Sequence, residues 1–163
     1  MTEVGLRHHT GGQVLAMLAD IADLYIAAHS GNPGESDELF SRPSFVTRTS
    51  EQAREPGFDL VTATVDSTLV GFSFGYLFGP GRWWADCTPL PQDVLTSSKF
   101  AVIELDVRKD YRGQGLGRKL LEELLKGRPE QFATLAATPG SQAHWMYLRW
   151  GWHKANATGF RPK

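Results

Sequence analysis

The stretch IELDVRKDYRGQGLGRKLLEELL, residues 103–125, contains the end of a strand, a glycine-rich turn and the start of a helix in direct succession. The strand begins upstream, and residues 100–107 (FAVIELDV) are nearly continuous in apolar residues, which predicts a central strand covered on both faces. From Leu116 onward leucines recur at helical spacing, which predicts an amphipathic helix. Three glycines occupy alternate positions between strand and helix: Gly113, Gly115 and Gly117. The stretch therefore predicts a β-loop-α unit whose turn carries few side chains.

The glycine-rich turn has the features of an anion-binding site. The first amides of a helix lack acceptors within the helix and carry positive dipole character, and glycines allow a bulky polyphosphate to approach them. The turn is not a P-loop, because Gly117 is followed by Arg118, and it is not a Rossmann fingerprint, which needs glycine at position 118. The alternative is a helix start with many glycines. Since Gly117 in the first turn would cost about 0.5–1 kcal/mol relative to alanine, we favour a ligand.

The whole chain of 163 residues fits one domain, residues 1–163. In the first half, the pattern predicts a short strand (4–8), an amphipathic helix (14–26), a weaker helix within 36–54 and an antiparallel hairpin (58–65 with 69–78). A long loop without a clear period follows (79–98). The second half is predicted as strand (100–107), helix (116–125), strand (132–137) and helix (141–150). Because the second half reads β-loop-α-β-α, we expect a parallel strand pair joined by a crossover helix.

The composition excludes several classes of protein. Hydrophobic residues at 41% and charged residues at 21% indicate an ordinary globular core. A net charge of -1 argues against a nucleic-acid module and against binding to anionic membranes, so any anion site must be local. The single cysteine, Cys87, cannot form an internal disulfide, and residues 1–9 lack an apolar signal core, so we expect a cytoplasmic protein. No segment approaches the roughly 18 apolar residues of a membrane span.

The residues of the strand, turn and helix resemble the acyl-coenzyme A motif of the GNAT superfamily of N-acyltransferases, written as Gln or Arg, x, x, Gly, x, Gly or Ala. Arg112, Gly115 and Gly117 fill its fixed positions. The stretch AHWMYLRWGW, residues 143–152, resembles a second motif of the family. Its family positions are filled by Ala143, Tyr147, Gly151 and Trp152. The resemblance covers about residues 100–152 and implies an α/β fold with a mixed, mostly antiparallel twisted sheet, a central parallel strand pair and about four flanking helices.

The resemblance also implies a cofactor site. The diphosphate of acetyl-CoA would lie on the backbone of the turn, and the pantetheine arm would pair with the motif strand where the family's strand bulges. The implied cofactor-binding residues are Leu105, Asp106, Val107, Arg112, Gly113, Gln114, Gly115, Leu116, Gly117 and Arg118.

Two residues are catalytic candidates. By the family match, Tyr147 would protonate the departing thiolate, although a tyrosine packed in the core is the alternative. Glu104 and Asp106 are two apart on a strand and so project from the same face, where a carboxylate pair could hold an ammonium group and deprotonate it. We favour Glu104 as base or amine anchor, with Asp106 in reach of the substrate, against the alternative that one or both merely cap or pair with neighbouring basic groups.

Other side chains are weaker candidates. In one interpretation, Arg82, Trp83 and Trp84, with Asp86 behind them, form a substrate wall. In the other, equally supported interpretation, the two tryptophans bury a loop or a subunit contact. His144 is expected to pack beside tryptophan rather than carry protons. The five histidines show no paired ligand spacing, so we expect no metal, and Cys87 has no nucleophile setting.

The leading hypothesis is an N-acetyltransferase that moves an acetyl group directly from acetyl-CoA to a primary amine of a small molecule or protein. The alternative is a catalytically weak CoA-binding sensor or interaction module. Two departures motivate it: Gly140 stands where many members carry asparagine, and about ten residues after Trp152 leave little room for a last strand. A homodimer is a further expectation; the acceptor is not predicted.

Overall fold

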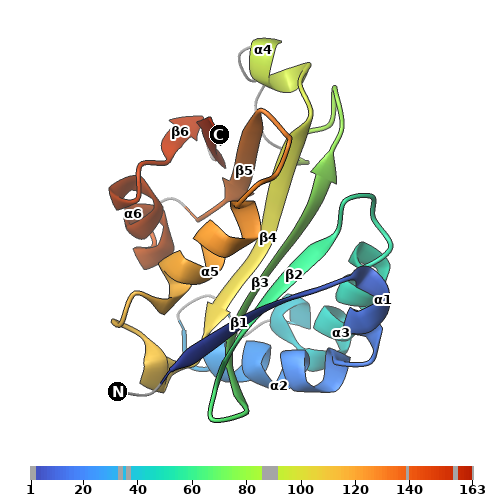
Figure 1. The fold of residues 1–163 in the computed structure, drawn as a ribbon. Coiled ribbons are helices and arrows are strands. Elements are labelled where there is room, and N and C mark those ends of the chain that lie inside the picture. The colour runs from blue at the N-terminus through green and yellow to red at the C-terminus, as the bar shows by residue number, and fades with distance from the viewer. Residues whose placement is uncertain are drawn as a thin grey trace. The chain divides into compact units, whose positions relative to one another are not determined.

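The computed structural model describes residues 3–32, 35, 38–85, 92–138, 140–155 and 158–162, with side chains described through Lys154. Seven strands form one sheet in the order β1-β2-β3-β4-β5-β7-β6 (Figure 1). The chain divides into two compact units, one of residues 1–74 and 104–126 and the other of residues 75–103 and 127–163. Strands β3 (Thr68–Phe78) and β4 (Lys99–Val107) each contribute residues to both units.

The first unit contains one edge of the sheet and most of the helices. Its remaining elements are β1 (Val4–His9), α1 (Gly11–Leu15), α2 (Leu18–His29), the 3₁₀ helix η1 (Glu38–Phe40), α3 (Arg42–Gln52), β2 (Asp59–Val65), the 3₁₀ helix η2 (Lys109–Tyr111) and α5 (Leu116–Leu125). β1 pairs antiparallel with β2, from Val4 opposite Val65 to His9 opposite Leu60. Helix α2 packs against α3, and α5 packs against β1 and β2.

The core of the first unit is built by the predicted apolar stripes. Leu120, Leu121 and Leu124 of α5 are buried, as the leucine spacing predicts. Tyr25 of α2 stacks on Phe45 of α3, with ring centroids 4.2 Å apart. The predicted hairpin is confirmed: β2 and β3 are joined at residues 66 and 67, which both have positive φ, the geometry of a two-residue turn.

The second unit contains the parallel strand pair. β4 pairs in parallel with β5 (Phe132–Ala136), from Lys99 opposite Phe132 to Val102 opposite Leu135. β5 then pairs antiparallel with β7 (Thr158–Pro162), which pairs with β6 (His153–Ala155). The two helices of this unit are α4 (Gln92–Leu95) and α6 (Gln142–Arg149). The predicted crossover and the mixed, mostly antiparallel sheet are confirmed.

Three expectations about the fold are wrong. The single helix over residues 14–26 is two helices, because a capping box between Thr10 and Gln13 starts α1 early and the chain breaks at Ala16 and Met17 before α2. The loop over residues 79–98 contains the short helix α4. Both differences raise the number of α-helices in the described residues to six, above the expected four or so.

The third correction concerns the last strand. We expected little room for it after Trp152, yet residues 158–162 form β7, which pairs along the whole of β5. A strand needs only about 3.3 Å of length per residue, so five residues suffice to cover the five of β5. Among the described residues, no helix has both the length and the apolar character required to cross a membrane.

Candidate active site

The glycine turn, residues 112–117, presents an open row of backbone amides at the start of α5. Gly113 and Gly115 have φ values of 78° and 77°, and a Cβ atom added to either would meet nothing within 4 Å. Within the described residues, the amides of residues 113–118 have no acceptor, and the first amide bonded into α5 is that of Lys119, which donates to the Gly115 carbonyl over 3.1 Å. A phosphate group is the ligand such amides favour.

Arg112 supports the turn from the protein side. Its Nε donates to the Val107 carbonyl over 3.1 Å, and its Nη2 donates to the Ala28 carbonyl over 2.9 Å at the end of α2. The guanidinium thus fixes the end of β4 and the end of α2 to the turn. Arg118 and Lys119 remain exposed on α5, and Arg118 pairs with Glu122 over 3.1 Å. Positive charge for an anion therefore comes from Arg118 and Lys119 and from the helix dipole.

The predicted pantetheine contacts lie at the end of β4. Pairing with β5 covers Lys99 to Val102, so Leu105, Asp106 and Val107 follow the last paired residue. The Val107 carbonyl is occupied by Arg112, while the Glu104 carbonyl accepts from the Ser73 hydroxyl over 2.7 Å. Leu105 is half-buried, and no acceptor or donor within the described residues bonds its backbone across to β5.

Glu104 and Asp106 do project from the same face of β4, and they meet a third group that the sequence did not indicate. His29, the last residue of α2, donates from Nε2 to Asp106 Oδ1 over 2.9 Å and from Nδ1 to Glu35 Oε2 over 2.9 Å. Ligand atoms of His29, Glu104 and Asp106 all lie within 4.8 Å of one another. We call His29, Glu35, Glu104 and Asp106 the His29 cluster. Asp106 thus pairs with a basic neighbour, as the alternative interpretation expects for one or both carboxylates, while the role of Glu104 stays a prediction.

The environment makes Glu104 an unusual acid. Burial, and then the negative charge of Asp106, raise the pKa of the Glu104 carboxyl well above its ordinary value. Ligand atoms of the Glu104 and Asp106 carboxyl groups lie within 4.8 Å of each other. Asp106 Oδ2 is buried and has no hydrogen-bond partner in the described residues, and a proton retained on Glu104 is a donor that this oxygen would accept. A carboxylate with a raised pKa is a stronger base, which suits removal of a proton from an ammonium group.

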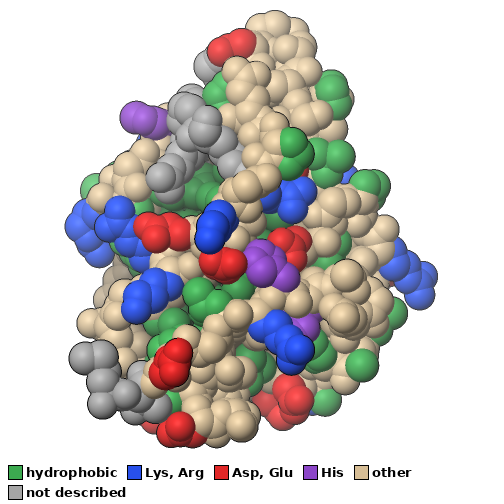
Figure 2. Space-filling model, in the orientation of Figure 1, with side chains coloured by type: hydrophobic (Ala, Val, Ile, Leu, Met, Phe, Trp, Pro, Cys, Tyr) green, Lys and Arg blue, Asp and Glu red, His purple; other side chains and the backbone are tan. Residues whose placement is uncertain are grey.

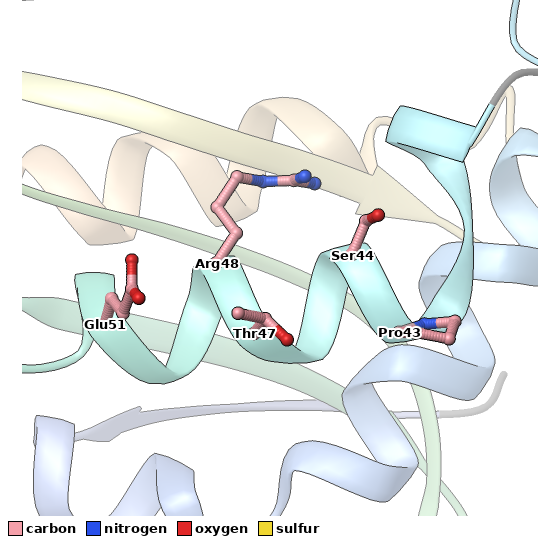
Figure 3. Close-up of a pocket in the computed structure, with 5 residues that line it drawn as sticks. All are labelled: Pro43, Ser44, Thr47, Arg48 and Glu51. Carbon is pink, nitrogen blue, oxygen red and sulfur yellow. The ribbon is translucent and has the colours of Figure 1, made fainter.

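Tyr25 and Arg48 border the cluster. Burial and the charge of Glu104 raise the pKa of Tyr25 to about 12, so the phenol stays neutral. Arg48 Nη2 donates to the Tyr25 hydroxyl over 3.4 Å, and its positive charge counteracts the raised pKa of Glu104. Arg48 also lines a hollow of about 390 Å³ along α3; the five lining residues are Pro43, Ser44, Thr47, Arg48 and Glu51. Figure 3 shows Ser44 and Arg48 leaving the same side of α3.

His29, Glu104 and Asp106 are also the residues that could hold a metal ion among those described. His29 Nε2 already bonds to Asp106 Oδ1 over 2.9 Å, whereas Asp106 Oδ2 has no hydrogen-bond partner in the described residues. The expectation of a metal-free site stays a prediction.

Tyr147 lies in the second unit, on α6. Its ring contacts Trp150 and Trp152 edge-on, with centroids 5.7 and 6.0 Å apart, and it is half-buried. Both the packing and the catalytic interpretation remain compatible with this setting. His144 accepts from the Gly140 amide over 2.7 Å at Nδ1 and stacks on Trp145, so the expectation that it packs beside tryptophan is confirmed.

Trp83 and Trp84 pack within the second unit. Trp84 Nε1 donates to Thr134 Oγ1 over 3.0 Å, and its ring lies 5.1 Å from that of Phe78. Trp83 covers Val94 and Phe132. Both indoles therefore bury the loop after β3, as one of the two interpretations expects, and their role as a substrate wall stays a prediction. Asp86 and Cys87 lie outside the described residues.

The comparisons with known proteins agree with these features. The profile for an acetyltransferase (GNAT) domain matches residues 57–154, which is more than half of the chain. The chain belongs to the GNAT acetyltransferase family. This match extends from the β2–β3 hairpin through the glycine turn to β6, so it covers both motifs.

Individual GNAT relatives are distant. A GCN5-like protein acetyltransferase of Mycobacterium tuberculosis is 32% identical over 84 residues, which are 45% of this chain and 40% of that protein. The chain thus spans about two fifths of the length of this curated relative. Among solved structures, the PaiA N-acetyltransferase of Thermoplasma acidophilum in complex with coenzyme A has a TM-score of 0.66 at 14% identity, covering 99% of both chains. A protein of Pyrococcus horikoshii has a TM-score of 0.69 at 20% identity, also covering 99% of both.

Sequence reasoning missed His29, Glu35 and Arg48. His29 is 77 positions from Asp106 and follows an ordinary amphipathic helix, so no spacing connects the two residues. The only signal was indirect: Glu104 and Asp106 lie in an apolar strand, where a buried carboxylate needs a partner. That argument requires a partner but cannot name it.

Proposed function

We propose that this GNAT protein transfers an acetyl group from acetyl-CoA directly to a primary amine of a small molecule or protein. The observation that carries the proposal is the open row of amides at residues 113–118, which begins α5 directly after the motif strand. The amides, the helix dipole and the cations of Arg118 and Lys119 suit the diphosphate of coenzyme A. Coenzyme A would supply the thioester that makes the acetyl group transferable.

The acceptor amine must lose a proton before it can attack. Alkylammonium groups have a pKa near 10.4, so a base is required at neutral pH. Glu104 has the raised pKa and the half-buried setting that suit this role, and the Asp106 side chain lies beside it. We assign Glu104 as general base and Asp106 as part of the amine site.

The departing thiolate needs a proton, and the thioester oxygen gains negative charge during attack. Tyr147, at the matched position of the second motif, is the proposed proton donor. Backbone groups of residues 105–107 are the proposed partners of the pantetheine arm and the polarised oxygen. The cytoplasm is the expected location, and a homodimer is the expected assembly.

A panel assay tests the function. We expect release of free thiol from acetyl-CoA with at least one class of primary amine, and binding of coenzyme A by calorimetry. Gly113→Ala should weaken that binding about tenfold or more, because the methyl group occupies the space above the amides and the residue keeps a positive φ that alanine adopts poorly.

Gly127→Ala is the matched control. Gly127 has a φ of 72°, is exposed and has open space around its Cβ position, so the strain is comparable while the glycine turn is untouched. Binding should be unchanged in this variant. Equal effects of both substitutions, or no coenzyme A binding by the wild-type protein, would sink the proposal.

A second candidate function is a CoA-binding sensor or interaction module. It rests on Gly140, which has no side chain to offer a cofactor and whose amide is bonded to His144. Coenzyme A binding with no thiol release for any amine, and no loss of basal turnover in Tyr147→Phe, would favour this function.

A further inference from the structure

The His29 cluster contains more negative groups than one base requires. Glu35, Glu104 and Asp106 are three carboxyl groups around one imidazole, and Asp106 is only 6% exposed. Both ring nitrogens of His29 face carboxylate oxygens at 2.9 Å, so the ring can donate at both only as the imidazolium ion. Hydrogen bonds to Asp106 and Glu35 outweigh the effect of burial and raise the pKa of His29 above its ordinary value.

The geometry connects this positive charge to the proposed base. His29 bonds to Asp106 over 2.9 Å, and ligand atoms of His29, Glu104 and Asp106 all lie within 4.8 Å of one another. Two adjacent carboxyl groups cannot both ionise easily, and one normally retains the proton. A cation bonded to one of them lowers the cost of ionising the other.

We propose that His29 is a positioning residue for catalysis: as imidazolium it neutralises Asp106, which allows Glu104 to ionise, and it thereby sets the pH above which the enzyme is active. The proposal rests on the proposed function and deepens it. In the reaction, an N–H bond of the ammonium group breaks, an O–H bond forms at Glu104, and the freed electron pair of nitrogen attacks the thioester carbon. The C–S bond then breaks, and the departing thiolate takes a proton from Tyr147. His29 takes no part in bond making.

Other charged groups surround His29 and must be included in its pH dependence. Tyr25 lies on the same helix with its ring centroid 4.3 Å away, and it stays neutral. Lys109 donates to the Ser30 carbonyl, and Arg112 donates to the Ala28 carbonyl, so two cations lie near the end of α2. Arg48 acts on Glu104 from α3. The facing groups are thus Glu35, Glu104, Asp106, Tyr25, Arg48, Lys109 and Arg112.

The first unit also offers a matched control. His8 on β1 lies between Asp59 and Glu123, with ring nitrogens 2.9 and 3.0 Å from carboxylate oxygens. We call these three residues the His8 cluster. It has the same chemistry as the His29 cluster, but its histidine is 44% exposed and β1 is separated from β4 by β2 and β3 in the sheet.

The experiment compares His29→Gln with His8→Gln and the wild type. Glutamine can still donate to Asp106 but carries no charge. The pH profile of kcat/KM should keep its plateau within about threefold in His29→Gln, while its acidic limb moves up by about one to two pH units, the shift expected when a neighbouring opposite charge is lost. His8→Gln should leave the limb in place.

A second readout is independent of activity. Carboxyl groups are labelled with ¹³C in glutamate, and the Glu104 signal is assigned by its absence in Glu104→Gln. Its titration should move up by the same one to two pH units in His29→Gln. If the wild type turns over no amine, the proposed function fails, while this titration still tests the role of His29.

A milder variant guards against a folding defect. Glu35→Gln removes one partner of the imidazolium ring. Because the negative charge of Glu35 itself raises the pKa of Glu104, the limb and the titration should not move up in this variant as they do in His29→Gln. An unmoved Glu104 titration in His29→Gln overturns the proposal. The proposal is also overturned if His29→Gln lowers the plateau of kcat/KM more than about tenfold without moving the acidic limb. An equal shift of the acidic limb in His8→Gln would overturn it as well.

Discussion

The first unit holds two histidines in nearly the same local chemistry, and they differ in what surrounds them. His8 and His29 each bond two carboxylates at about 3 Å, yet the His8 ring is 44% exposed and the His29 ring 18%. Figure 2 shows acidic, basic and histidine side chains interspersed on the face that carries β1 and α5, where solvent screens their charges. Burial lowers the pKa of each histidine and its two carboxylates raise it, with a net rise in both, so the clusters differ in burial and not in the pairing itself.

Removing one carboxyl group from each cluster should give the largest difference in kcat/KM. Glu104→Gln should lower kcat/KM about a hundredfold or more, because a positioned general base contributes at least that much. Glu123→Gln, which removes a partner of His8, should change kcat/KM by less than about twofold. Steady-state assays at the pH optimum measure both. A loss of kcat/KM below about tenfold in Glu104→Gln would show that Glu104 is not the general base.

The pH dependence of stability should separate the clusters more subtly. The pKa of His29 is raised in the folded protein, so its stabilising effect is complete below about pH 6.5, the ordinary value, and is lost as pH rises through the folded value. The pKa of Glu104 is also raised in the folded protein, so its contribution to stability is complete below about pH 4.3, the ordinary value, and is lost as pH rises through the folded value. The wild-type Tm should therefore fall between pH 6 and pH 9.

In His29→Gln this fall should shrink by about 2–4 °C, which corresponds to about 1 kcal/mol in a protein of this size. His8→Gln should shrink the fall by less, because the pKa of His8 is also raised but its exposed pair is screened. Differential scanning calorimetry across the pH range measures both variants. Parallel slopes for the two variants would show that burial does not distinguish the clusters.

Metal removal should have the smallest effect. His29, Glu104 and Asp106 could form a metal site by their spacing, but His29 Nε2 already bonds to Asp106 Oδ1 over 2.9 Å. Dialysis of the wild-type protein against a chelator should change turnover by less than about twofold. The control is the same dialysed protein after zinc or magnesium has been added back. A large loss that either ion reverses would make the His29 cluster a metal site and end its comparison with the His8 cluster.

Local sequence patterns determined much of the fold. The leucine spacing of α5, the apolar run of β4, the hairpin of β2 and β3 and the parallel crossover all follow from periodicities of a few residues, because each element buries one repeating face. The glycine turn was equally visible, since a positive φ at Gly113 and Gly115 is a property of single residues. The break between α1 and α2 was missed because a capping box competes with a helical period that continues across it.

Only the tertiary structure decided how the acid–base groups are arranged. The sequence by itself placed Glu104 and Asp106 on one face of a strand and required a partner for a buried carboxylate. It could not select His29 from five histidines, or distinguish it from His8, because 77 positions separate His29 from Asp106 and the contact arises where the end of α2 meets β4. Burial and charge depend on which elements pack together, so the pKa of Glu104 is a property of the fold and not of its neighbours in the chain.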